Sequence, residues 1–435
     1  MILQKYDSYK DSGVEWLGEI PKDWEVKRLK DVYKEIGSGG TPSSENLNYY
    51  EGNIPWVRSG DLNNSIVEDV PFKITNEALN NSSAKMFPKG TFIIAMYGAS
   101  VGKMGILGLD ASTNQACCCI VTNKNKIDIK YLYYYYNFYK PLLIKDAVGG
   151  GQPNISQGLL KLSWLIYPEK NQQTAISNFL DKKTSQIDSK INLLQEKITS
   201  YEDLKKSVIN ETVCRGLNKD VELKDSEIEW IGNIPKHWKV ERLKNIFNER
   251  VEKNKKLDGE PITDNILSVM KDIGVINHRD KGNVGNKMSE DISGYKIVHP
   301  KDIVVNKMNV IIGSVGISKE YGALSVIYII LKTKPESHPE FYDYVFRSKY
   351  FQKYLRTIAT GILEIREAVN STLFKHQGLP NPPKEEQIQI ANYLDEKITK
   401  IDNIISKIKD QINTLKEFRK TVINDVVTGK VRVEE

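Results

Sequence analysis

The residue types that most often carry catalysis are scattered in this 435-residue chain. No two of its five histidines have the HxH or HxxxH spacing that is typical of a metal site. These histidines are His237, His278, His299, His338 and His376. The acidic residues of 181–211 and 395–425 alternate with lysine, as on a solvated helix face, and do not form the carboxylate cluster that a metal-dependent nuclease needs. We therefore expect no metal site and no catalytic residue.

One segment comes close to a catalytic motif. Adenine-amino methyltransferases use Asn-Pro-Pro followed by an aromatic residue to grip the exocyclic amine, but Asn381-Pro382-Pro383 is followed by Lys384. No glycine-rich loop follows an early strand to hold S-adenosylmethionine, and Gly39-Gly40 and Gly149-Gly150-Gly151 lack the Gly-Lys-Ser/Thr of a phosphate-binding loop. Because proline at such a place ends one element and starts the next, we interpret the triplet as structural.

The four cysteines, Cys117, Cys118, Cys119 and Cys214, are typical of a reducing compartment. Three consecutive cysteines cannot pair with one another without strain, and no CxxC spacing supports zinc. In a strand, Cys117 and Cys119 would face one side and Cys118 the other, each as a small hydrophobic residue. The mean hydropathy is −0.43, and no apolar run approaches the ~18 residues of a membrane helix. We expect a cytoplasmic protein without a membrane span or a secretion signal.

Binding is the remaining function, and the net charge of +6 permits an acidic partner. Arginine and lysine suit the guanine edge, asparagine and glutamine suit adenine, and lysine also suits phosphate. The candidates for DNA contact are loop residues of such types: Arg58, Ser59, Asp61, Lys103, Asn114, Gln115, Gln152 and Asn154 in the first half, and Lys271, Arg279, Asn306, Lys307, Asn309 and Arg366 in the second. For any one of them, an ordinary surface or turn role is the alternative.

A repeat with a period of 214 residues organises the elements that position these loops. Residues 15–30 (EWLGEIPKDWEVKRLK) and 229–244 (EWIGNIPKHWKVERLK) agree at 11 of 16 positions. The same period relates Phe179-Leu180-Asp181 to Tyr393-Leu394-Asp395. A duplicated unit predicts a molecule with pseudo-twofold symmetry, which is compatible with the twofold symmetry of the duplex DNA backbone.

Each repeat contains a mixed part followed by a helical part. Short β-rich runs, punctuated by glycine and interleaved with helical stretches, predict a compact α+β domain in about 20–165 and again in about 234–380. Apolar residues at steps of mostly three and four, without Gly or Pro, predict long helices over 173–213 and 387–427. The predicted seam residues are Ile176, Leu180, Ile187, Ile191, Leu194, Ile198, Tyr201, Leu204 and Val208, and Ile390, Leu394, Ile398, Ile401, Ile405, Ile408, Ile412, Leu415, Phe418 and Val422.

Neither long helix can hide its apolar seam alone, so each needs a partner helix. The first helix leads the chain to the second domain and the second helix starts there, so packing within one chain is antiparallel. Pairing between two chains is the alternative. We therefore predict an α+β fold with two globular domains, each followed by a long helix. The two helices pack as an antiparallel coiled coil with pseudo-twofold symmetry.

Several sequence blocks occur in the same order in both halves. Glu15-Trp16-Leu17-Gly18-Glu19-Ile20-Pro21-Lys22-Asp23-Trp24, with Arg28-Leu29, opens the first domain, and Ile54-Pro55-Trp56-Val57-Arg58-Ser59-Gly60-Asp61-Leu62 follows. Pro382-Pro383-Lys384-Glu385-Glu386-Gln387-Ile388 leads into the second helix, and Glu169-Lys170-Asn171-Gln172-Gln173 is a looser copy. These blocks resemble the specificity subunit of type I restriction–modification enzymes over essentially the whole chain.

The resemblance implies a non-catalytic subunit whose two target-recognition domains each read one half of a bipartite, asymmetric site in double-stranded DNA. The implied protein partners are two methyltransferase subunits, which methylate adenine N6, and restriction subunits, which hydrolyse ATP and cleave. We expect S-adenosylmethionine, ATP and Mg on those partners and no cofactor on this chain. The alternatives are a self-contained methyltransferase or nuclease, and a coiled-coil scaffold that binds proteins and not DNA.

The domain boundaries that we expect follow from the repeat and the resemblance. They are 1–168 for the first recognition domain, 169–213 for its helix, 214–228 for a linker, 229–383 for the second recognition domain, 384–427 for its helix and 428–435 for a C-terminal tail.

The two copies agree in the segments that open each domain and in the long helices, and they differ in the segments between, which would contact the DNA bases. Residues 45–85 and 255–295 do not align convincingly, which predicts two different half-sites. Replacing the divergent segment of one copy with that of the other is expected to change one half-site of the methylated sequence. Sequencing of methylated DNA measures this, and a change in both halves would contradict a modular arrangement.

Overall fold

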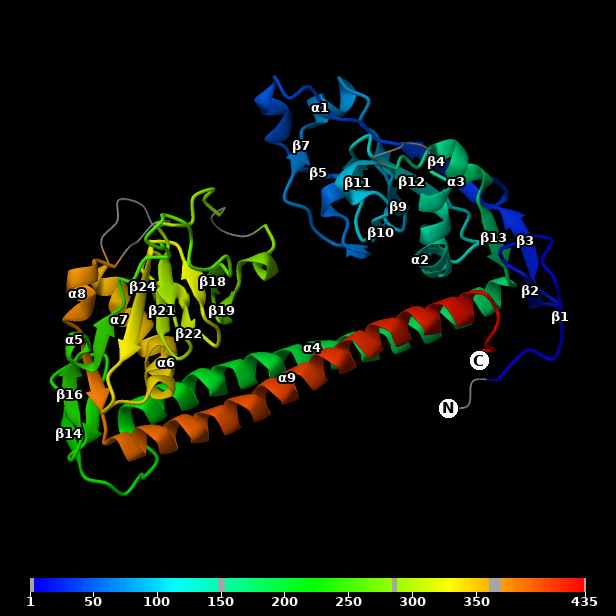
Figure 1. Ribbon diagram of the computed structural model, residues 1–435. Helices are drawn as coiled ribbons and strands as arrows, with labels where there is room; N and C mark the ends of the chain where they lie inside the picture. Colours follow the sequence, from blue (N-terminus) through cyan, green and yellow to red (C-terminus); the bar gives the residue numbers. More distant parts are fainter. Residues whose placement is uncertain (1–3, 148–152, 284–287, 360–368, 434–435) are drawn as a thin grey trace. The chain divides into compact units, whose positions relative to one another are not determined.

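The computed structural model describes residues 4–147, 153–283, 288–359 and 369–433 (Figure 1). The chain divides into two compact units. Unit 1 contains Met1–Leu194 and Asp410–Glu435, and unit 2 contains Gln195–Lys409. Each unit holds an α+β globular part and a stretch of both long helices, so the predicted fold class is confirmed. The helices α4 (Lys170–Arg215) and α9 (Lys384–Val427) each contribute to both units. The domain boundaries expected from the sequence instead divide the chain into consecutive segments.

Unit 1 is built on two mixed sheets. The first has the order β4 (Tyr33–Ser38), β12 (Cys117–Thr122), β9 (Phe92–Ala95), β10 (Met104–Leu107) and β6 (Ser65–Val67). The second has the order β7 (Lys73–Ile74), β5 (Ile54–Val57), β11 (Ala111–Thr113) and β8 (Met86–Phe87). The helices beside them are α1 (Asn76–Asn80), α2 (Ile129–Lys145) and α3 (Gln157–Leu162).

The central strands of unit 1 are buried on both faces. In β12, Cys118 packs into the cluster that also holds Phe92, whereas Cys117 and Cys119 pack into the cluster on the opposite face with Ile93. This is the alternation that the sequence predicts for a strand. All three thiols are free, and burial raises the pKa of each of them, so they pack as small apolar groups.

Unit 2 has a smaller set of sheets. Its largest has the order β17 (Phe247–Glu249), β24 (Tyr328–Thr333), β21 (Ile303–Asn306) and β22 (Val315–Ile317). Two-stranded sheets pair β18 (Leu267–Met270) with β19 (Gly274–Asn277) and β20 (Lys296–Val298) with β23 (Gly322–Leu324). The helices are α5 (Leu243–Ile246), α6 (Pro339–Arg347), α7 (Lys349–Ile358) and α8 (Ser371–Lys375).

The repeated sequence forms the same frame in each unit. It begins with a hairpin, β1 (Tyr9–Asp11) with β2 (Glu19–Pro21) in unit 1 and β14 (Leu223–Asp225) with β15 (Asn233–Pro235) in unit 2. A second pair leads into the long helix, β3 (Glu25–Arg28) with β13 (Trp164–Tyr167) and β16 (Lys239–Arg242) with β25 (Gly378–Asn381). Trp24 and Trp238, 214 positions apart, are both fully buried beneath these frames. The repeat therefore encodes the frame of each domain and leaves the remaining sheets to differ.

Within each unit, α4 and α9 pack against each other and against the globular core. In unit 1, Ile176 and Leu180 of α4 share a cluster with Val422 of α9. In unit 2, Ile209 of α4 shares a cluster with Ile390 of α9. Residues near the start of one helix thus meet residues near the end of the other, which confirms the antiparallel pairing.

Two ion pairs between the helices repeat the same contact. Arg419 Nε lies 2.9 Å from Asp188 Oδ1 in unit 1, and Lys205 Nζ lies 2.7 Å from Asp402 Oδ1 in unit 2. Asp402 lies 214 positions after Asp188, and Arg419 lies 214 positions after Lys205. One contact is therefore the counterpart of the other, and the helices pair in the same register in both units.

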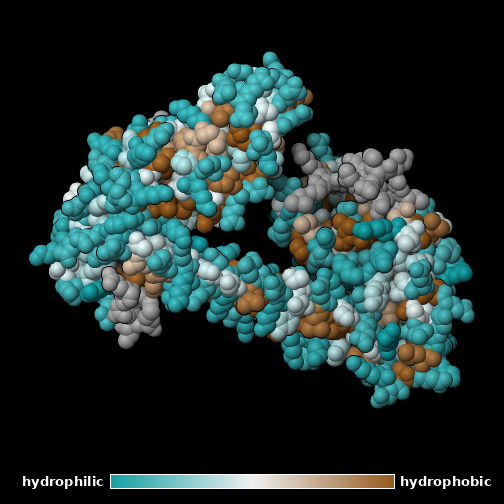
Figure 2. All heavy atoms as spheres, turned by 180° about the vertical axis from the view of Figure 1, so that it is seen from behind, coloured by the Kyte–Doolittle hydropathy of each residue, from teal (hydrophilic) through white to brown (hydrophobic). Residues whose placement is uncertain are grey.

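The predicted seam is wrong at two positions that are counterparts of each other. Leu204 is 48% exposed and Phe418 is 51% exposed, although both follow the previous seam residue by three positions. In a regular seam, steps of four and three residues alternate, so the residue after Tyr201 in the seam is Lys205 and not Leu204. The Lys205 ammonium pairs with Asp402 of the other helix. The apolar residue one place earlier is turned out to solvent. On the face drawn in Figure 2, hydrophobic patches likewise interrupt the hydrophilic surface of the long helices.

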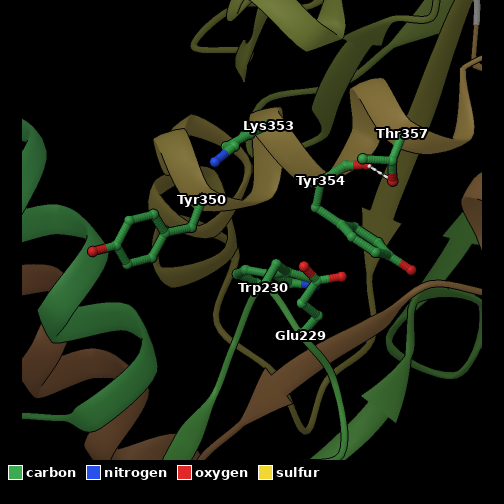
Figure 3. Close-up of a pocket in the computed structure, with 6 residues that line it drawn as sticks. All are labelled: Glu229, Trp230, Tyr350, Lys353, Tyr354 and Thr357. Atoms are coloured by element: carbon green, nitrogen blue, oxygen red, sulfur yellow. Dashed lines mark hydrogen bonds between the residues drawn. The ribbon is translucent and has the colours of Figure 1, made fainter.

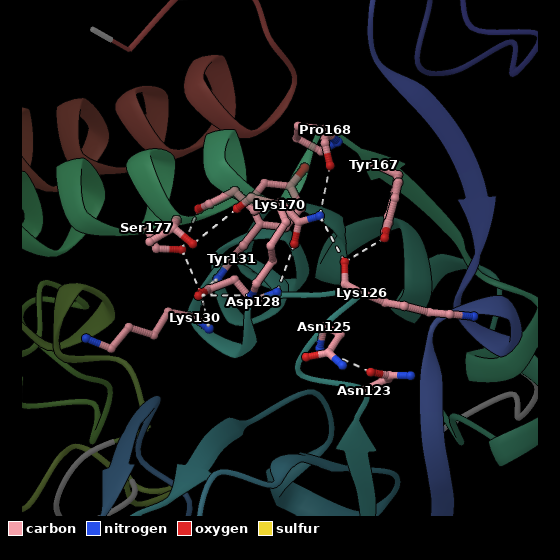
Figure 4. Close-up of polar contacts among 12 residues, drawn as sticks. Asn123, Asn125, Lys126, Asp128, Lys130, Tyr131, Tyr167, Pro168, Lys170 and Ser177 are labelled. Carbon is pink, nitrogen blue, oxygen red and sulfur yellow. Dashed lines mark hydrogen bonds and ion pairs between the residues drawn. The ribbon is translucent and has the colours of Figure 1, made fainter. Parts of the chain in front are cut away.

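A buried glutamine joins each globular part to its long helix. Gln173 Oε1 accepts from the Asp128 amide, which precedes α2, and Gln173 Nε2 donates to the Pro168 carbonyl, each over 2.8 Å. Asp128 in turn accepts from the Ser177 hydroxyl at 2.9 Å (Figure 4). In unit 2, Gln387 makes the same two 2.8 Å bonds, accepting from the amide of His338 and donating to the carbonyl of Pro382. Both glutamines are fully buried, so each fixes a domain helix to the start of a long helix.

The last residues of the described chain pair with the first ones inside unit 1. The amide of Arg432 donates to the carbonyl of Gln4 over 2.8 Å, and the Tyr9 hydroxyl donates to the carbonyl of Gly429 over 3.2 Å. The segment after α9 therefore completes the frame of the first domain.

Replacing Gln387 with alanine tests the junction. The change leaves the His338 amide and the Pro382 carbonyl without partners, so we expect unit 2 to lose about 1–3 kcal/mol of stability. Hydrogen exchange at the start of α6 and thermal unfolding measure the loss. Gln389→Ala, at an exposed position on the same helix, is the matched control and should change neither. Equal effects of the two variants would contradict the role of the buried amide.

Candidate nucleic-acid interface

Arg58 and Asp61 are held by each other in unit 1. Arg58 Nη2 lies 3.2 Å from Asp61 Oδ1, and the Arg58 amide donates to Asp61 Oδ2 over 2.9 Å. The guanidinium also stacks over the Phe72 ring, 3.5 Å from its centre. Ser59 is half-buried in the 3-10 turn (Ser59–Asp61) that these contacts cap. Their first role is to shape the turn after β5.

Three candidates of unit 1 meet around the end of β9. The Ala95 amide donates to the carbonyl of Lys103, the Met96 amide donates to the carbonyl of Ala116, and the Ile155 amide donates to the carbonyl of Met96, each over 2.8 Å. These bonds bring Lys103, Gln115 and Asn154 to the same end of the sheet, and the side chains of Gln115 and Asn154 are exposed. Gln152 lies outside the described residues. This cluster is the best-formed candidate reading surface of unit 1.

Asn114 and Gln115 differ in how their side chains are used. The main-chain amide of Asn114 donates to the Val57 carbonyl at 2.9 Å. The buried side-chain Oδ1 of Asn114 has no hydrogen-bond partner in the part of the chain that the structure describes. Gln115 Oε1 accepts from the hydroxyl of Thr41, and the residue is exposed. Asn114 therefore carries an unsatisfied acceptor beside the cluster.

Unit 2 separates its candidates into structural and exposed residues. Asn306 is buried and caps its own loop by accepting from the Met308 amide at 3.1 Å, and Lys307 is half-buried. Lys271 and Asn309 are exposed. Their loops adjoin, since the Asp272 amide donates to the carbonyl of Gly313 at 3.3 Å.

The 3-10 turn His278–Lys281 carries another candidate. Arg279 is exposed there, and its amide donates to Asn277 Oδ1 at 3.0 Å, which caps the turn. Arg366 lies outside the described residues. Among the described unit 2 candidates, Arg279 and Asn309 are therefore free to reach a ligand, whereas Lys271 Nζ lies 3.9 Å from Asp272 Oδ2.

A basic loop of unit 2 lies outside the residues that the sequence indicates as candidates. Lys253, Lys255 and Lys256 are exposed, whereas Asn254 between them is fully buried and bonds through Nδ2 to the carbonyl of Thr263 at 2.8 Å. The buried asparagine holds the lysine-bearing loop in place. Its signal in the sequence is the run of lysines, which stands at the start of the segment where the two copies diverge.

Within residues 4–147, 153–283, 288–359 and 369–433, no group of three or more His, Cys, Asp or Glu residues could hold a metal ion. None of the helices in these ranges is both long and apolar enough to cross a membrane.

Two copies of one α+β frame, each with its own sheets and each continued by a long paired helix, define a protein with two recognition domains. The family model of the type I restriction modification DNA specificity domain matches residues 21–199 and again residues 235–414. The chain therefore belongs to the type I restriction–modification DNA specificity family and carries two target-recognition domains, which confirms the expected class. The scaffold alternative is not favoured.

Curated relatives cover the chain at moderate identity. It is 27% identical over 451 residues to the type I restriction enzyme MjaIX specificity subunit of Methanocaldococcus jannaschii, covering 96% of each chain. It is 28% identical over 218 residues to the EcoR124I/EcoR124II specificity subunit of Escherichia coli, covering 47% of this chain and 52% of the relative.

Solved structures share the fold at low identity. A chain from a type I restriction–modification system matches with a TM-score of 0.72 at 16% identity, covering 94% of this chain and 98% of that one. The HsdS subunit from Thermoanaerobacter tengcongensis matches with a TM-score of 0.57 at 16% identity, covering 95% and 98%.

Arg279 and Arg58 offer a matched comparison of a free and a committed arginine. We expect Arg279→Ala to weaken binding of duplex DNA and, if the contact is to phosphate, to make the salt dependence shallower by about one unit of slope. Arg58→Ala should instead lower thermal stability, because it releases Asp61 and Phe72. Lys409→Ala, at an exposed position of α9, is the control for loss of charge. DNA titrations at several salt concentrations would contradict the assignment if Arg279→Ala and Lys409→Ala behaved alike.

Proposed function

We propose that this chain gives a type I restriction–modification enzyme its DNA sequence specificity by reading a bipartite, asymmetric site, one half-site with each domain. The observation that carries the proposal is the contrast between the repeated frame and the unlike sheets. The hairpins, the strand pairs and the buried glutamines recur 214 positions apart, whereas the sheets of unit 1 and unit 2 differ in strand number and order. Two domains that share the opening hairpin and strand pair but differ in their other sheets favour recognition of two different half-sites.

The chain acts as a subunit without a catalytic step of its own. Partner subunits supply adenine-N6 methylation and cleavage, and they carry S-adenosylmethionine, ATP and Mg. The scattered histidines and the unmatched Asn-Pro-Pro triplet support this division of labour. At the triplet, Asn381 lies in β25 and the Pro382 carbonyl is bonded to Gln387 at 2.8 Å, so these groups are engaged in the junction.

Two methyltransferase subunits bind the repeated parts of the chain. Leu204 in unit 2 and Phe418 in unit 1 are exposed apolar counterparts 214 positions apart. A protein partner would gain from covering each of them, because an exposed large apolar side chain beside polar neighbours suits an interface. One such position per unit supports two copies of the same partner.

The experiment that tests the proposed function expresses this chain with its methyltransferase subunit in a host without other adenine methylation. Sequencing of modified bases is expected to show methylated adenines in one bipartite motif with a fixed, unread spacer. Methylation that is absent, or that occurs at a continuous motif, would refute the proposal. Steeply salt-sensitive binding of duplex DNA separates a DNA reader from a protein scaffold.

The long helices set the spacer. Inserting one heptad into the middle of both helices keeps their register and lengthens each by about 10 Å. We expect the unread spacer to grow by about three base pairs, at roughly 3.4 Å per base pair. The same insertion in α4 alone puts the two seams out of register and should abolish assembly of the enzyme. An unchanged spacer in the double insertion would exclude the helices as the ruler.

A further inference from the structure

The loop that opens each domain has the same rigid turn in both units. In unit 1 the Val14 carbonyl accepts from the amides of Leu17 at 2.9 Å and Gly18 at 3.2 Å. In unit 2 the Ile228 carbonyl accepts from the amides of Ile231 and Gly232, each at 3.0 Å. Gly18 and Gly232 have φ angles of 68° and 65°, which favour glycine. We call residues 12–18 and 226–232 the Glu-Trp loops, because each presents a glutamate followed by a tryptophan.

Aromatic residues of the domain helices support the tryptophan of each Glu-Trp loop. The Trp16 ring lies 5.3 Å from the ring of Tyr139, centre to centre, and Trp16 is 37% exposed. The Trp230 ring lies 4.9 Å from that of Phe351. Such contacts fix the orientation of a large aromatic surface. Trp16 keeps part of this surface exposed, whereas Trp230 is almost fully buried and lines a cavity.

In unit 2, the Glu-Trp loop and α7 line a cavity of about 250 Å³ that is open to solvent. Its lining residues are Glu229, Trp230, Tyr350, Lys353, Tyr354 and Thr357 (Figure 3). The volume is far larger than the about 10–15 Å³ that a single water needs. Figure 3 shows the carboxylate of Glu229 beside the indole of Trp230, with the ring of Tyr354 facing it. The cavity therefore has room for a side chain of another molecule.

Two polar groups of this cavity lack a partner in the part of the chain that the structure describes. Trp230 is 7% exposed, and its buried indole nitrogen makes no hydrogen bond there. A buried donor without an acceptor costs about 1–3 kcal/mol. The carboxylate of Glu229 is exposed and forms no ion pair with a described residue. A ligand that brings both an acceptor and a positively charged donor would satisfy the two groups together.

We propose that this cavity binds an arginine of the methyltransferase subunit, and that Glu15 and Trp16 bind the same arginine of a second copy. The guanidinium stacks on the aromatic rings and donates to the carboxylate, the strongest pairing that such groups offer. A main-chain carbonyl of the same segment accepts from the indole of Trp230 or from Lys353. A DNA phosphate would pair with Lys353 but would also meet the carboxylate of Glu229, so DNA is the competing occupant that the cross-linking experiment below must exclude. This inference rests on the proposed function and names a contact by which its partner is held.

Charge reversal of the glutamates tests the inference in the full chain purified with its methyltransferase subunit. Glu229→Lys is expected to weaken the binding of one copy at least tenfold, and Glu15→Lys with Glu229→Lys to weaken both, as measured by the mass and stoichiometry of the complex. Glu336→Lys is the matched control, because Glu336 is also an exposed acid of unit 2. Binding by Glu229→Lys like that of the unaltered chain, or equal losses in the control, would overturn the inference. All variants change exposed side chains, and thermal unfolding checks that they fold.

A photo-crosslinking residue at Tyr350, which is 53% exposed, identifies the occupant. The expected product joins α7 to an arginine-bearing segment of the methyltransferase subunit, and reversing that arginine to glutamate should restore binding to Glu229→Lys. Cross-links to DNA alone, or to a segment without arginine, would overturn the inference while a bipartite methylation motif still supports the proposed function. If the unaltered chain neither binds the methyltransferase subunit nor directs methylation, both proposals fail.

Discussion

The structure depends on the pairing of two apolar seams that cannot be stable apart. An isolated helix as long as α4 or α9 would expose a continuous row of isoleucines and leucines to water. In each unit the row of one helix is covered by the row of the other, and at the domain ends it continues into the globular core, where Leu180 and Leu394 are fully buried. The seam and the cores are therefore one hydrophobic system within each unit.

Polar contacts specify this pairing more than they stabilise it. Asp188 and Arg419 are about half and a third exposed, as are Asp402 and Lys205, and ion pairs at such exposure contribute about 0–1 kcal/mol. A cation in an otherwise apolar seam does, however, disfavour every register that leaves it without an acid. Both cations meet an aspartate in the same register. At the start of each long helix, a buried glutamine specifies how the helix meets its domain. Its side-chain amide joins three backbone segments: its own helix, the residue before a domain helix and the proline before the long helix.

The sequence predicts the features that depend on local periodicity and fails where distant segments decide. The helices followed from steps of three and four, and their orientation followed from the order of the domains. The seam predicted from the sequence wrongly includes Leu204, because the step after Tyr201 is four residues and not three. Arg58 was selected by residue type, but an aspartate three residues later was in place to hold it. The order of the sheets, and the meeting of Lys103 with Asn154 around β9, depend on pairings across long stretches of sequence that no local pattern encodes.

The contact between the two ends of the described chain has a consequence for the order of folding. Unit 2 is one continuous stretch, whereas the core of unit 1 includes Val422, Ile423, Val426 and Val427 from the end of α9. During synthesis the second domain can close first, while the first domain, made earliest, waits for the last turns of α9. Only unit 2 can therefore fold as its residues emerge in sequence order, because unit 1 needs residues from both ends of the chain. A ribosome that stops early would release a chain whose first recognition domain still exposes apolar surface to chaperones and proteases.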